Sequence, residues 1–527
     1  MSLWQILRIA AGPVAAAAVL LFADLDPARP AVTSAAAVAV WMALWWLTEA
    51  VPLAATALLP LALFPLLGIA SGGAIAGAYI NSTIFLFLGG FLLALAMERW
   101  HLHRRIALKI ILLAGGRPAH LVLGFMLSAA VLSMWISNTA TAIMMLPMAL
   151  AILSRENRNA PGADGASGAV ARGLGPCLLL GIAYAASIGG MATPVGTPPN
   201  LIMLRTYNIS FPDAPALSFG QWMFMGVPFA LAMLFATWAL LTQVLYRRDL
   251  RDTPAIDAGA LREEYVALGP TSREERAILV VFVLTALLWC FRSDIELGAW
   301  TLPGWSGFFA TGNLIDDGTV AILMALLLFV IPTSSKSRQS HPERPAAILD
   351  GEVFRHIPWA IVVLFGGGFA LAEGFVASGL AEYLVSGFAR LEHLPLLLII
   401  AVIALGMTFL TELTSNTAST QMVLPVLAAA AAAQGLHPLF LMLPATLSAS
   451  MAFMMPVATP PNAIVFSSDR LRIFDMARAG LFLNLIGVLF VSACVYWLAS
   501  AVFQIDPGAP APEWLHAPPA KVSGDGS

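Results

Sequence analysis

The chain has 527 residues, of which 59% are hydrophobic and only 11% are charged, and its formal net charge at pH 7 is −3. Successive apolar runs reach the length of roughly 20 residues that one helix needs to cross a bilayer core, which indicates a polytopic helical protein of the lipid bilayer. The slightly acidic balance argues against a nucleic-acid partner. The three cysteines, Cys177, Cys290 and Cys494, lie in apolar runs without ligand-type spacing, which argues against a disulfide framework or a metal site.

In chain order, the apolar runs predict eleven membrane spans. They cover residues 7–22, 33–49, 53–70, 82–97, 176–206, 220–246, 276–292, 317–332, 357–380, 438–466 and 473–503. The start of the chain carries a single Arg and no convincing cleavage site, so we interpret 7–22 as a span and not as a signal peptide. Two further apolar segments cover 121–153 and 395–434. Polar linkers are predicted at 155–173, 247–275 and 333–356, and a disordered Pro/Ala-rich tail at 504–527.

Basic residues concentrate in some of the polar segments and set the predicted orientation. They are Arg99, Arg104, Arg105, Lys109, Arg155, Arg158, Arg172, Arg247, Arg248, Arg251, Lys336 and Arg338. Segments on the other side are neutral or acidic and contain Asp24, Asp26, Asp294, Glu296, Asp316 and Asp317. By the positive-inside rule, a multi-pass protein of the plasma (inner) membrane is predicted, with a cytoplasmic N-terminus and an external C-terminus. This requires 121–153 and 395–434 each to enter and leave on one side.

Each of those two segments contains the same polar triplet. Ser137-Asn138-Thr139 and Ser415-Asn416-Thr417 lie 278 positions apart (415 − 137 = 278). A helix over 121–153 would be about 50 Å long, too long for a core of roughly 30 Å, whereas each arm beside the triplet is too short to cross alone. We therefore expect a re-entrant helical hairpin in each half, with the triplet at its tip and buried in protein or facing a cavity.

A second matched pair follows the hairpins. Residues 197–200 and 459–462 both read Thr-Pro-Pro-Asn, 262 positions apart (459 − 197 = 262). Together with the glycine-rich runs 88–91 and 366–369, they predict two homologous halves, about 50–245 and 320–500, which form an inverted repeat. The prolines interrupt their helices, and the threonine before each pair is placed as the N-cap of a new helix.

The four motifs contain no Lys or Arg, which favours an anion site that is completed by cations. Polar side chains at membrane depth tend to face a pathway or a partner, although polar helix–helix contacts and proline kinks for packing are alternatives. Helix N-termini after the four breaks would present free N–H groups to a small anion. Hydroxyl, carbonyl and asparagine oxygens are hard ligands that suit Na⁺, and an asparagine amide can at the same time donate to a carboxylate.

These paired motifs resemble those of the divalent anion:sodium symporter family, the sodium/dicarboxylate cotransporters. So do the runs 45–52, 56–60, 63–69 and 450–465, and the resemblance covers nearly all of 35–500. It implies an all-α fold of about eleven transmembrane helices and two re-entrant hairpins, assembled as a homodimer. It also implies a scaffold beside a transport domain that moves as an elevator. The scaffold would be 1–119 and 276–394, the transport domain 120–246 and 395–503, and 247–275 a cytoplasmic linker.

Carried over by motif, the resemblance implies at least two Na⁺ sites and a substrate site. The first Na⁺ site would use Ser133, Ser137, Asn138 and Gly196, and the second Thr411, Ser415, Asn416 and Ala458. Substrate carboxylates would contact Ser137, Asn138, Thr139, Thr197, Pro198, Ser415, Asn416, Thr417, Thr459 and Pro460.

Other ionisable residues lie in or near spans without belonging to these motifs. The acids are Glu49, Glu98, Glu373 and Glu412. Glu412 lies beside the expected second Na⁺ site, so a cation or proton role is weighed against capping or pairing within the protein. The histidines at 101, 103 and 120 fall in the basic stretch 99–120, predicted as an interfacial amphipathic helix, and lack the partners of a zinc site.

We therefore predict a secondary active transporter, and not an enzyme, that imports a C4-dicarboxylate such as succinate, malate or fumarate together with Na⁺. Within the same fold, a Na⁺-independent dicarboxylate exchanger or a Na⁺-coupled citrate or sulfate symporter is the alternative. An intramembrane hydrolase would need a nucleophile with a base, and no His or Lys lies near the triplets. A passive anion channel would not accumulate its substrate against a gradient.

Overall fold

The computed structural model describes most of the chain. The described residues are 2–159, 173–256, 259–297, 300–334, 346–388, 394–509 and 512–516. Much of the predicted linkers 155–173 and 333–356, and most of the tail 504–527, therefore lie outside the described residues.

Helices make up nearly all of the regular structure, as the apolar runs predict. Up to the middle of the chain they are α1 Leu3–Phe22, α2 Pro30–Thr48, α3 Leu53–Thr56, α4 Leu59–Leu66, α5 Gly72–Tyr79, α6 Ser82–Arg99, α7 Leu102–Ala114, α8 Pro118–Ser133, α9 Asn138–Asn159, α11 Gly175–Gly190, α12 Pro198–Ser210, α13 Phe219–Ala239, the π-helix η2 Leu240–Leu245, α14 Arg247–Asp252 and α15 Gly259–Ala267.

The remainder of the described chain continues in the same way after one short hairpin of strands. Its elements are α16 Arg273–Cys290, β1 Ile295–Leu297, β2 Trp300–Leu302, η3 Trp305–Phe308, η4 Gly312–Leu314, α17 Asp317–Val330, η5 Gly351–Arg355, α19 Trp359–Ser378, α20 Leu380–Phe388, α21 Leu396–Thr411, α22 Asn416–Gln434, α23 Leu439–Ala449, α24 Pro460–Phe466, α25 Ile473–Ala493, the π-helix η6 Cys494–Ala499, α26 Ser500–Phe503 and η7 Glu513–His516. The strands β1 and β2 pair antiparallel.

Six helices of the described chain are long and apolar enough to cross a membrane. They are Leu3–Phe22, Pro30–Thr48, Gly72–Arg99, Phe219–Leu245, Trp359–Ser378 and Ile473–Phe503. The other apolar helices have 10 to 17 residues and are too short to cross a bilayer core singly. The protein is thus a helical membrane protein, while the count of eleven spans and the re-entrant path of the hairpins stay predictions.

The predicted span at 53–70 and the predicted tail differ from the structure. The span expected at 53–70 is divided into α3 and α4, because Pro60 lies in the first turn of α4, where proline starts a helix more readily than it continues one. The tail is not disordered throughout, since Glu513–His516 form a 3₁₀ turn. Trp514 in this turn packs edge-on against Phe211 and His437, with ring centroids 5.7 and 5.4 Å apart, and this contact orders the turn.

The basic stretch 99–120 contains α7, and both arginines of α7 form ion pairs within the protein. Arg105 is buried, pairs with Glu275 at 2.7 Å and donates to the carbonyl of Gly269 at 2.9 Å. Arg104 pairs with Glu264 of α15. The predicted contact with headgroups is therefore wrong for the buried Arg105, which instead holds α7 to the start of α16, whereas it stays a prediction for the partly exposed Arg104.

The two halves recur as structure. α8 and α21 each have 16 residues and begin 278 positions apart (396 − 118 = 278), while α9 and α22 keep the same offset. α12 and α24 begin 262 positions apart (460 − 198 = 262). α13 and α25 each have 21 residues, begin 254 positions apart (473 − 219 = 254), and each continues into a six-residue π-helix. The repeat read from four short motifs thus extends over whole helices.

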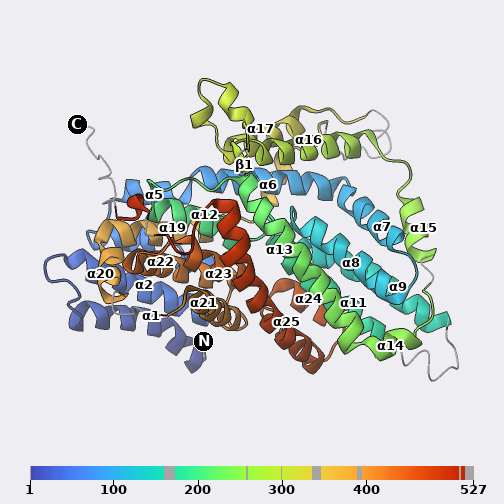
Figure 1. Cartoon of the computed structure of the whole chain (residues 1–527), viewed down its shortest axis with the longest axis horizontal. Coiled ribbons are helices and arrows are strands. Elements are labelled where there is room, and N and C mark those ends of the chain that lie inside the picture. Colours follow the sequence, from blue (N-terminus) through green and yellow to red (C-terminus); the bar gives the residue numbers. More distant parts are fainter. Residues whose placement is uncertain are drawn as a thin grey trace.

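Packing between the halves is reciprocal. α8 packs against α11 as α21 packs against α23, and α9 contacts α24 as α22 contacts α12. In Figure 1, α8, α9 and α11 lie side by side on the right, α19, α22 and α23 lie on the left, and α13 and α25 run between the two groups. Helices that follow a break therefore pack against the other half, which gathers the breaks in the interior.

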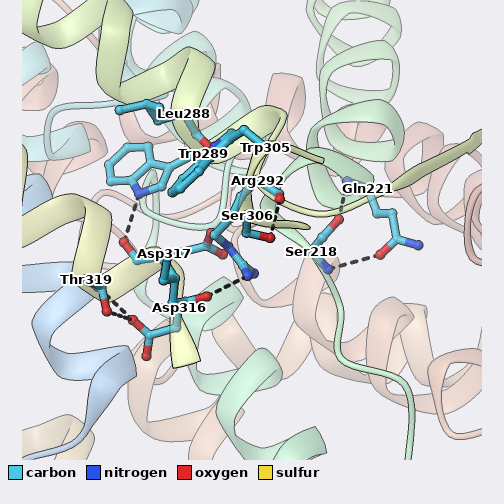
Figure 2. A network of polar contacts seen from close by, with 11 residues as sticks. Ser218, Gln221, Leu288, Trp289, Arg292, Trp305, Ser306, Asp316, Asp317 and Thr319 are labelled. Atoms are coloured by element: carbon cyan, nitrogen blue, oxygen red, sulfur yellow. Dashed lines mark hydrogen bonds and ion pairs between the residues drawn. The ribbon is translucent and has the colours of Figure 1, made fainter. Parts of the chain in front are cut away.

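The connection from α16 to α17 is fixed by a polar network (Figure 2). Arg292 pairs with Asp317 at the start of α17, and the indole of Trp289 donates to the Asp317 carbonyl at 2.9 Å. Asp316 caps α17 by accepting the backbone N–H of Thr319 at 2.7 Å. These contacts satisfy free groups at a helix start and close the acidic loop that carries β1 and β2.

Candidate functional site

Both polar triplets lie where one helix ends and the next begins. Asn138 and Asn416 are the first residues of α9 and α22, and the serine before each is the N-cap residue. The Ser137 hydroxyl oxygen accepts the backbone N–H of Ala140 at 3.2 Å, whereas Ser415 makes no side-chain capping bond. The predicted breaks are therefore present, and backbone N–H groups of both new helices are free at their N-termini.

The two Thr-Pro-Pro-Asn motifs also start new helices. The threonines Thr197 and Thr459 are N-caps in extended conformation, with φ of −146° and −138°, and a proline occupies the first position of α12 and α24. Ahead of these starts the chain is unwound over residues 191–197, the first unwound loop, and over 450–459, the second unwound loop. This is the arrangement that the paired prolines predict.

A single cavity of about 850 Å³ brings the four breaks together. All ten residues expected to contact substrate carboxylates line it: Ser137, Asn138, Thr139, Thr197, Pro198, Ser415, Asn416, Thr417, Thr459 and Pro460. These residues come from both halves of the chain, with the two triplets 278 positions apart and the two Thr-Pro-Pro-Asn motifs 262 apart. The apolar part of the wall includes Phe87, Phe91 and Trp135.

The residues expected to hold cations form two equivalent clusters. In the first, the buried Ser133 hydroxyl donates to Asn138 Oδ1. In the second, the buried Thr411 hydroxyl lies 2.6 Å from Asn416 Oδ1 and 2.8 Å from the carbonyl oxygen of Ala449, and can donate to either. Neither Ser133 nor Thr411 is among the described cavity-lining residues, so both reach the cavity through the asparagine beside them.

The backbone at the end of α11, just before the first unwound loop, packs closely against Asn138. A Cβ added to Gly190 would lie 2.7 Å from Asn138 Oδ1 and 3.1 Å from the Gly196 carbonyl oxygen. The hydroxyl of Ser133, the amide of Asn138 and this carbonyl are neutral, hard oxygen donors that suit Na⁺ better than a transition metal. Gly196 and its counterpart Ala458 both line the cavity. The chemistry of the residues present therefore fits a small hard cation.

Glu412 is held entirely by donors from within the protein. Its side chain accepts backbone N–H groups of Phe453, Met454 and Met455 at 2.7, 2.8 and 3.1 Å, and the amide of Asn484 at 2.8 Å. Glu412 is 4% exposed and also lines the cavity. Of the two roles weighed from the sequence, the contacts match capping, since the carboxylate fixes the second unwound loop.

Sequence reasoning did not place Arg8 or Glu49 at the cavity, and it missed Asn484 as a partner of Glu412. Arg8 and Glu49, from the start of α1 and just after the end of α2, line it although they lie in no repeated motif. The Asn484 amide, 72 positions from Glu412, gave no signal beyond being a polar residue within a long apolar run. Glu49 adopts a left-handed conformation with φ of 47°, which a sequence pattern does not reveal.

Comparison with known proteins agrees with this geometry. A family model described as the sodium:sulfate symporter transmembrane region matches residues 8–503, a range that contains both triplets and both Thr-Pro-Pro-Asn motifs. The chain belongs to this family. Members of the family are transporters, so the protein is a transporter and not an enzyme.

Curated relatives of this symporter family member include two named sodium-dependent dicarboxylate transporter SdcS. The protein of Staphylococcus saprophyticus is 39% identical over 508 residues, covering 96% of this chain and 94% of its own. That of Staphylococcus aureus strain RF122 is 40% identical over 476 residues, covering 90% of this chain and 88% of its own.

Among solved structures, the YdaH transporter of Alcanivorax borkumensis has a similar fold. It superposes with a TM-score of 0.52 at 15% identity, covering 83% of this chain and 88% of its own. The MtrF efflux pump of Neisseria gonorrhoeae gives a TM-score of 0.51 at 14% identity, covering 83% and 84%. At these identities the likeness concerns the fold alone.

Proposed function

We propose that this protein is a secondary active transporter that couples import of C4-dicarboxylates, such as succinate, malate and fumarate, to the inward flow of Na⁺. The observation that carries the proposal is the cavity in which two equivalent Ser-Asn-Thr triplets face two equivalent Thr-Pro starts. The curated relatives named above, sodium-dependent dicarboxylate transporters over nearly the whole chain, support the same substrate class.

A dicarboxylate in this cavity would be bound without a Lys or Arg in any of the four motifs. The N-termini of α9 and α22 offer free N–H groups and a partial positive charge, whereas α12 begins with two prolines that have no N–H and contributes only the partial charge of its helix dipole. The hydroxyls of Thr139 and Thr417 and the asparagine amides add donors, and one triplet can hold each end of a C4 substrate. Two carboxylates exceed the charge that such dipoles balance, and Arg8 on the cavity wall lies outside the four motifs, so we propose that cations accompany the substrate.

Two Na⁺ ions, co-transported as cargo, would supply that charge. We assign the first to Ser133, Ser137, Asn138 and Gly196, and the second to Thr411, Ser415, Asn416 and Ala458. The hydroxyl–amide pairs at Asn138 and Asn416 support the assignment, because each asparagine can turn its oxygen to Na⁺ and its NH₂ to a carboxylate. Coupling then has a physical cause, since the cation completes the anion site.

The membrane arrangement that we propose places the N-terminus in the cytoplasm and the C-terminus outside, with two re-entrant hairpins. Arg8 at the start of α1 and Glu49 after α2 line the cavity, which supports a cavity that opens toward that end of both helices. In the proposed orientation this end is cytoplasmic, which makes the conformation inward-facing.

We further propose an elevator mechanism in a homodimer, with the transport domain 120–246 and 395–503 moving against the scaffold 1–119 and 276–394. The reciprocal contacts of α9 with α24 and of α22 with α12 support one rigid transport unit. Arg205 of α12 pairs with Glu373 of α19 at 3.2 Å across the proposed boundary, a contact that the motion would have to break.

The experiment is uptake of radiolabelled succinate into proteoliposomes under an inward Na⁺ gradient, compared with K⁺. Uptake should require Na⁺, should be inhibited by unlabelled malate and fumarate, and should be lost in Asn138→Ala and Asn416→Ala. A buried Thr446→Val variant, whose hydroxyl bonds only within α23, serves as the matched control.

Three results would overturn parts of the proposal. Equal uptake in K⁺ that requires internal dicarboxylate would make the protein an exchanger and remove the Na⁺ sites. Transport of sulfate or citrate in place of succinate would keep the site and change the substrate. Uptake that only equilibrates, without accumulation, would indicate a channel.

A further inference from the structure

Two buried asparagines outside the triplets repeat the same hydrogen bonds in both halves. Asn200 donates its amide to the carbonyl oxygens of Gly190 and Thr193 at 3.1 and 2.8 Å. Asn462 donates in the same way to Ala452 and Met455, both at 3.0 Å. Donors and acceptors are all related by the offset of 262 (462 − 200, 452 − 190 and 455 − 193). Both asparagines are 0% exposed.

These bonds hold carbonyl groups at and after the helix breaks. The carbonyls of Thr193 and Met455 also accept the backbone N–H of Gly196 and Ala458, at 3.3 and 3.2 Å. A helix that ends inside the protein has unpaired carbonyl oxygens, and each would be costly if buried without a donor. The NH₂ group of asparagine carries two donors and so can satisfy two such carbonyls at once. Because both partners are acceptors, the amide orientation is fixed, with nitrogen toward the loop.

The remaining atom of each amide shows what the residue contributes. Asn200 Oδ1 and Asn462 Oδ1 are buried without a hydrogen-bond partner in the described part of the chain. A buried oxygen of this kind is unfavourable, because it has lost its hydrogen bonds to water and gained none in the protein. The favourable contribution of each asparagine therefore comes from its two N–H donors on the unwound loop.

Through the loop, Asn200 reaches the first cation cluster. Asn200 donates to the carbonyl of Gly190, and Gly190 packs against Asn138 Oδ1. Gly196 packs closely against the same carbonyl, since a Cβ added to Gly196 would lie 2.5 Å from its oxygen. Release of this carbonyl would let Gly190 and Gly196 shift relative to Asn138. In the second half, Asn462 holds the carbonyls of Ala452 and Met455, and the Met455 carbonyl also accepts the backbone N–H of Ala458 at 3.2 Å.

We infer that Asn200 and Asn462 are positioning residues that set the ligand geometry of the two Na⁺ sites by clamping the unwound loops. The inference rests on the proposed Na⁺-coupled function and goes beyond it by assigning a role to residues that do not line the cavity. Asn200 acts on the first site and Asn462 on the second. Both act on Na⁺ affinity more than on recognition of the substrate carboxylates.

The test uses full-length protein with Asn200→Ala or Asn462→Ala, and Thr446→Val as a buried polar control on α23. Two quantities are measured: the half-saturating Na⁺ concentration for succinate uptake, and the Na⁺-dependent rise in melting temperature of purified protein. Loss of two hydrogen bonds from the loop should raise the half-saturating Na⁺ concentration by about tenfold or more. At saturating Na⁺ the succinate KM should stay within about twofold.

A merely structural role would lower the amount of active protein and leave the Na⁺ dependence where it was, and that result would overturn the inference. Should an alanine variant fail to fold, Asn200→Ser and Asn462→Ser keep one donor and should give a smaller shift in the same direction. If wild-type protein shows no Na⁺ dependence, the proposed function itself fails. If wild-type protein depends on Na⁺ and the asparagine variants show the same Na⁺ dependence, the proposed function stands and only the inference about the clamp fails.

Discussion

The first and second unwound loops occupy equivalent places but are held by different chemistry. In the first, the Thr193 hydroxyl donates to the carbonyl of Met134, just after the end of α8. In the second, the position equivalent to Met134 is Glu412 (412 − 134 = 278), whose carboxylate binds three consecutive backbone N–H groups. The fourth donor, Asn484, stands where the first half has Ala230 (484 − 230 = 254).

This difference shows that the repeat conserves the backbone path more strictly than the contacts that maintain it. Both loops are clamped by an asparagine, yet one has a neutral hydrogen bond and the other a buried carboxylate with four donors. Hydrogen bonds to a charged group contribute about 1.5–3 kcal/mol, compared with about 1 kcal/mol for a neutral bond. The second loop should therefore depend far more on one side chain than the first does.

The largest effect is expected from Glu412→Ala. It leaves three buried N–H groups and the Asn484 amide without their acceptor, which should lower the free energy of unfolding by roughly 3–5 kcal/mol. Melting curves of the purified protein measure this. The matched control is Met134→Ala, which keeps the carbonyl used in the first half. Similar melting temperatures for the two variants would contradict the asymmetry.

A second test uses two glycines that pack against the unwound loops, Gly480 of α25 and Gly226 of α13. A Cβ on Gly480 would lie 2.2 Å from the Phe453 carbonyl oxygen, and one on Gly226 would lie 2.7 Å from that of Ala192. Both clashes are with backbone atoms, which cannot move aside as side chains do. Gly480→Ala should lower the free energy of unfolding by roughly 1–3 kcal/mol. Gly226→Ala should lower it less, because its Cβ would lie farther from the carbonyl oxygen. Differential scanning fluorimetry gives the order, and the reverse order would contradict the account.

A subtler change is Glu412→Gln, which keeps one acceptor oxygen and removes the negative charge beside the cavity. Na⁺ affinity should fall several-fold, since an anion near a cation site favours cation binding. The succinate KM at saturating Na⁺ should not rise. Na⁺ titrations of uptake provide the measurement, and an unchanged half-saturating Na⁺ concentration would assign the carboxylate to loop structure alone.

The smallest effect is expected from Thr193→Val. It removes the single neutral bond to the Met134 carbonyl and should lower the free energy of unfolding by about 1 kcal/mol. Thermal melting with and without Na⁺ measures it. A decrease in the free energy of unfolding as large as that of Glu412→Ala would show that the two loops depend equally on these hydrogen bonds.

The helix breaks and the residues around the cavity could be predicted because short motifs recur at fixed offsets. Because the triplet occurs twice at a fixed offset, it indicates where each helix break lies and which segment of the other half corresponds to it. Thr-Pro-Pro marks a helix start by itself. The partners of Glu412 could not be predicted in this way, since Asn484 and Ala230 share no residue type. The α3–α4 division and the turn around Trp514 depend on tertiary contacts that leave no periodic signal.

The central claim is that the cation completes the anion site, and succinate binding at equilibrium tests it most directly. Purified protein in detergent would be titrated with radiolabelled succinate in Na⁺ and in K⁺ at equal ionic strength. The account predicts saturable binding in Na⁺, about 100-fold weaker binding in K⁺, and no such difference in Asn138→Ala or Asn416→Ala. Equal affinity in the two salts would contradict it.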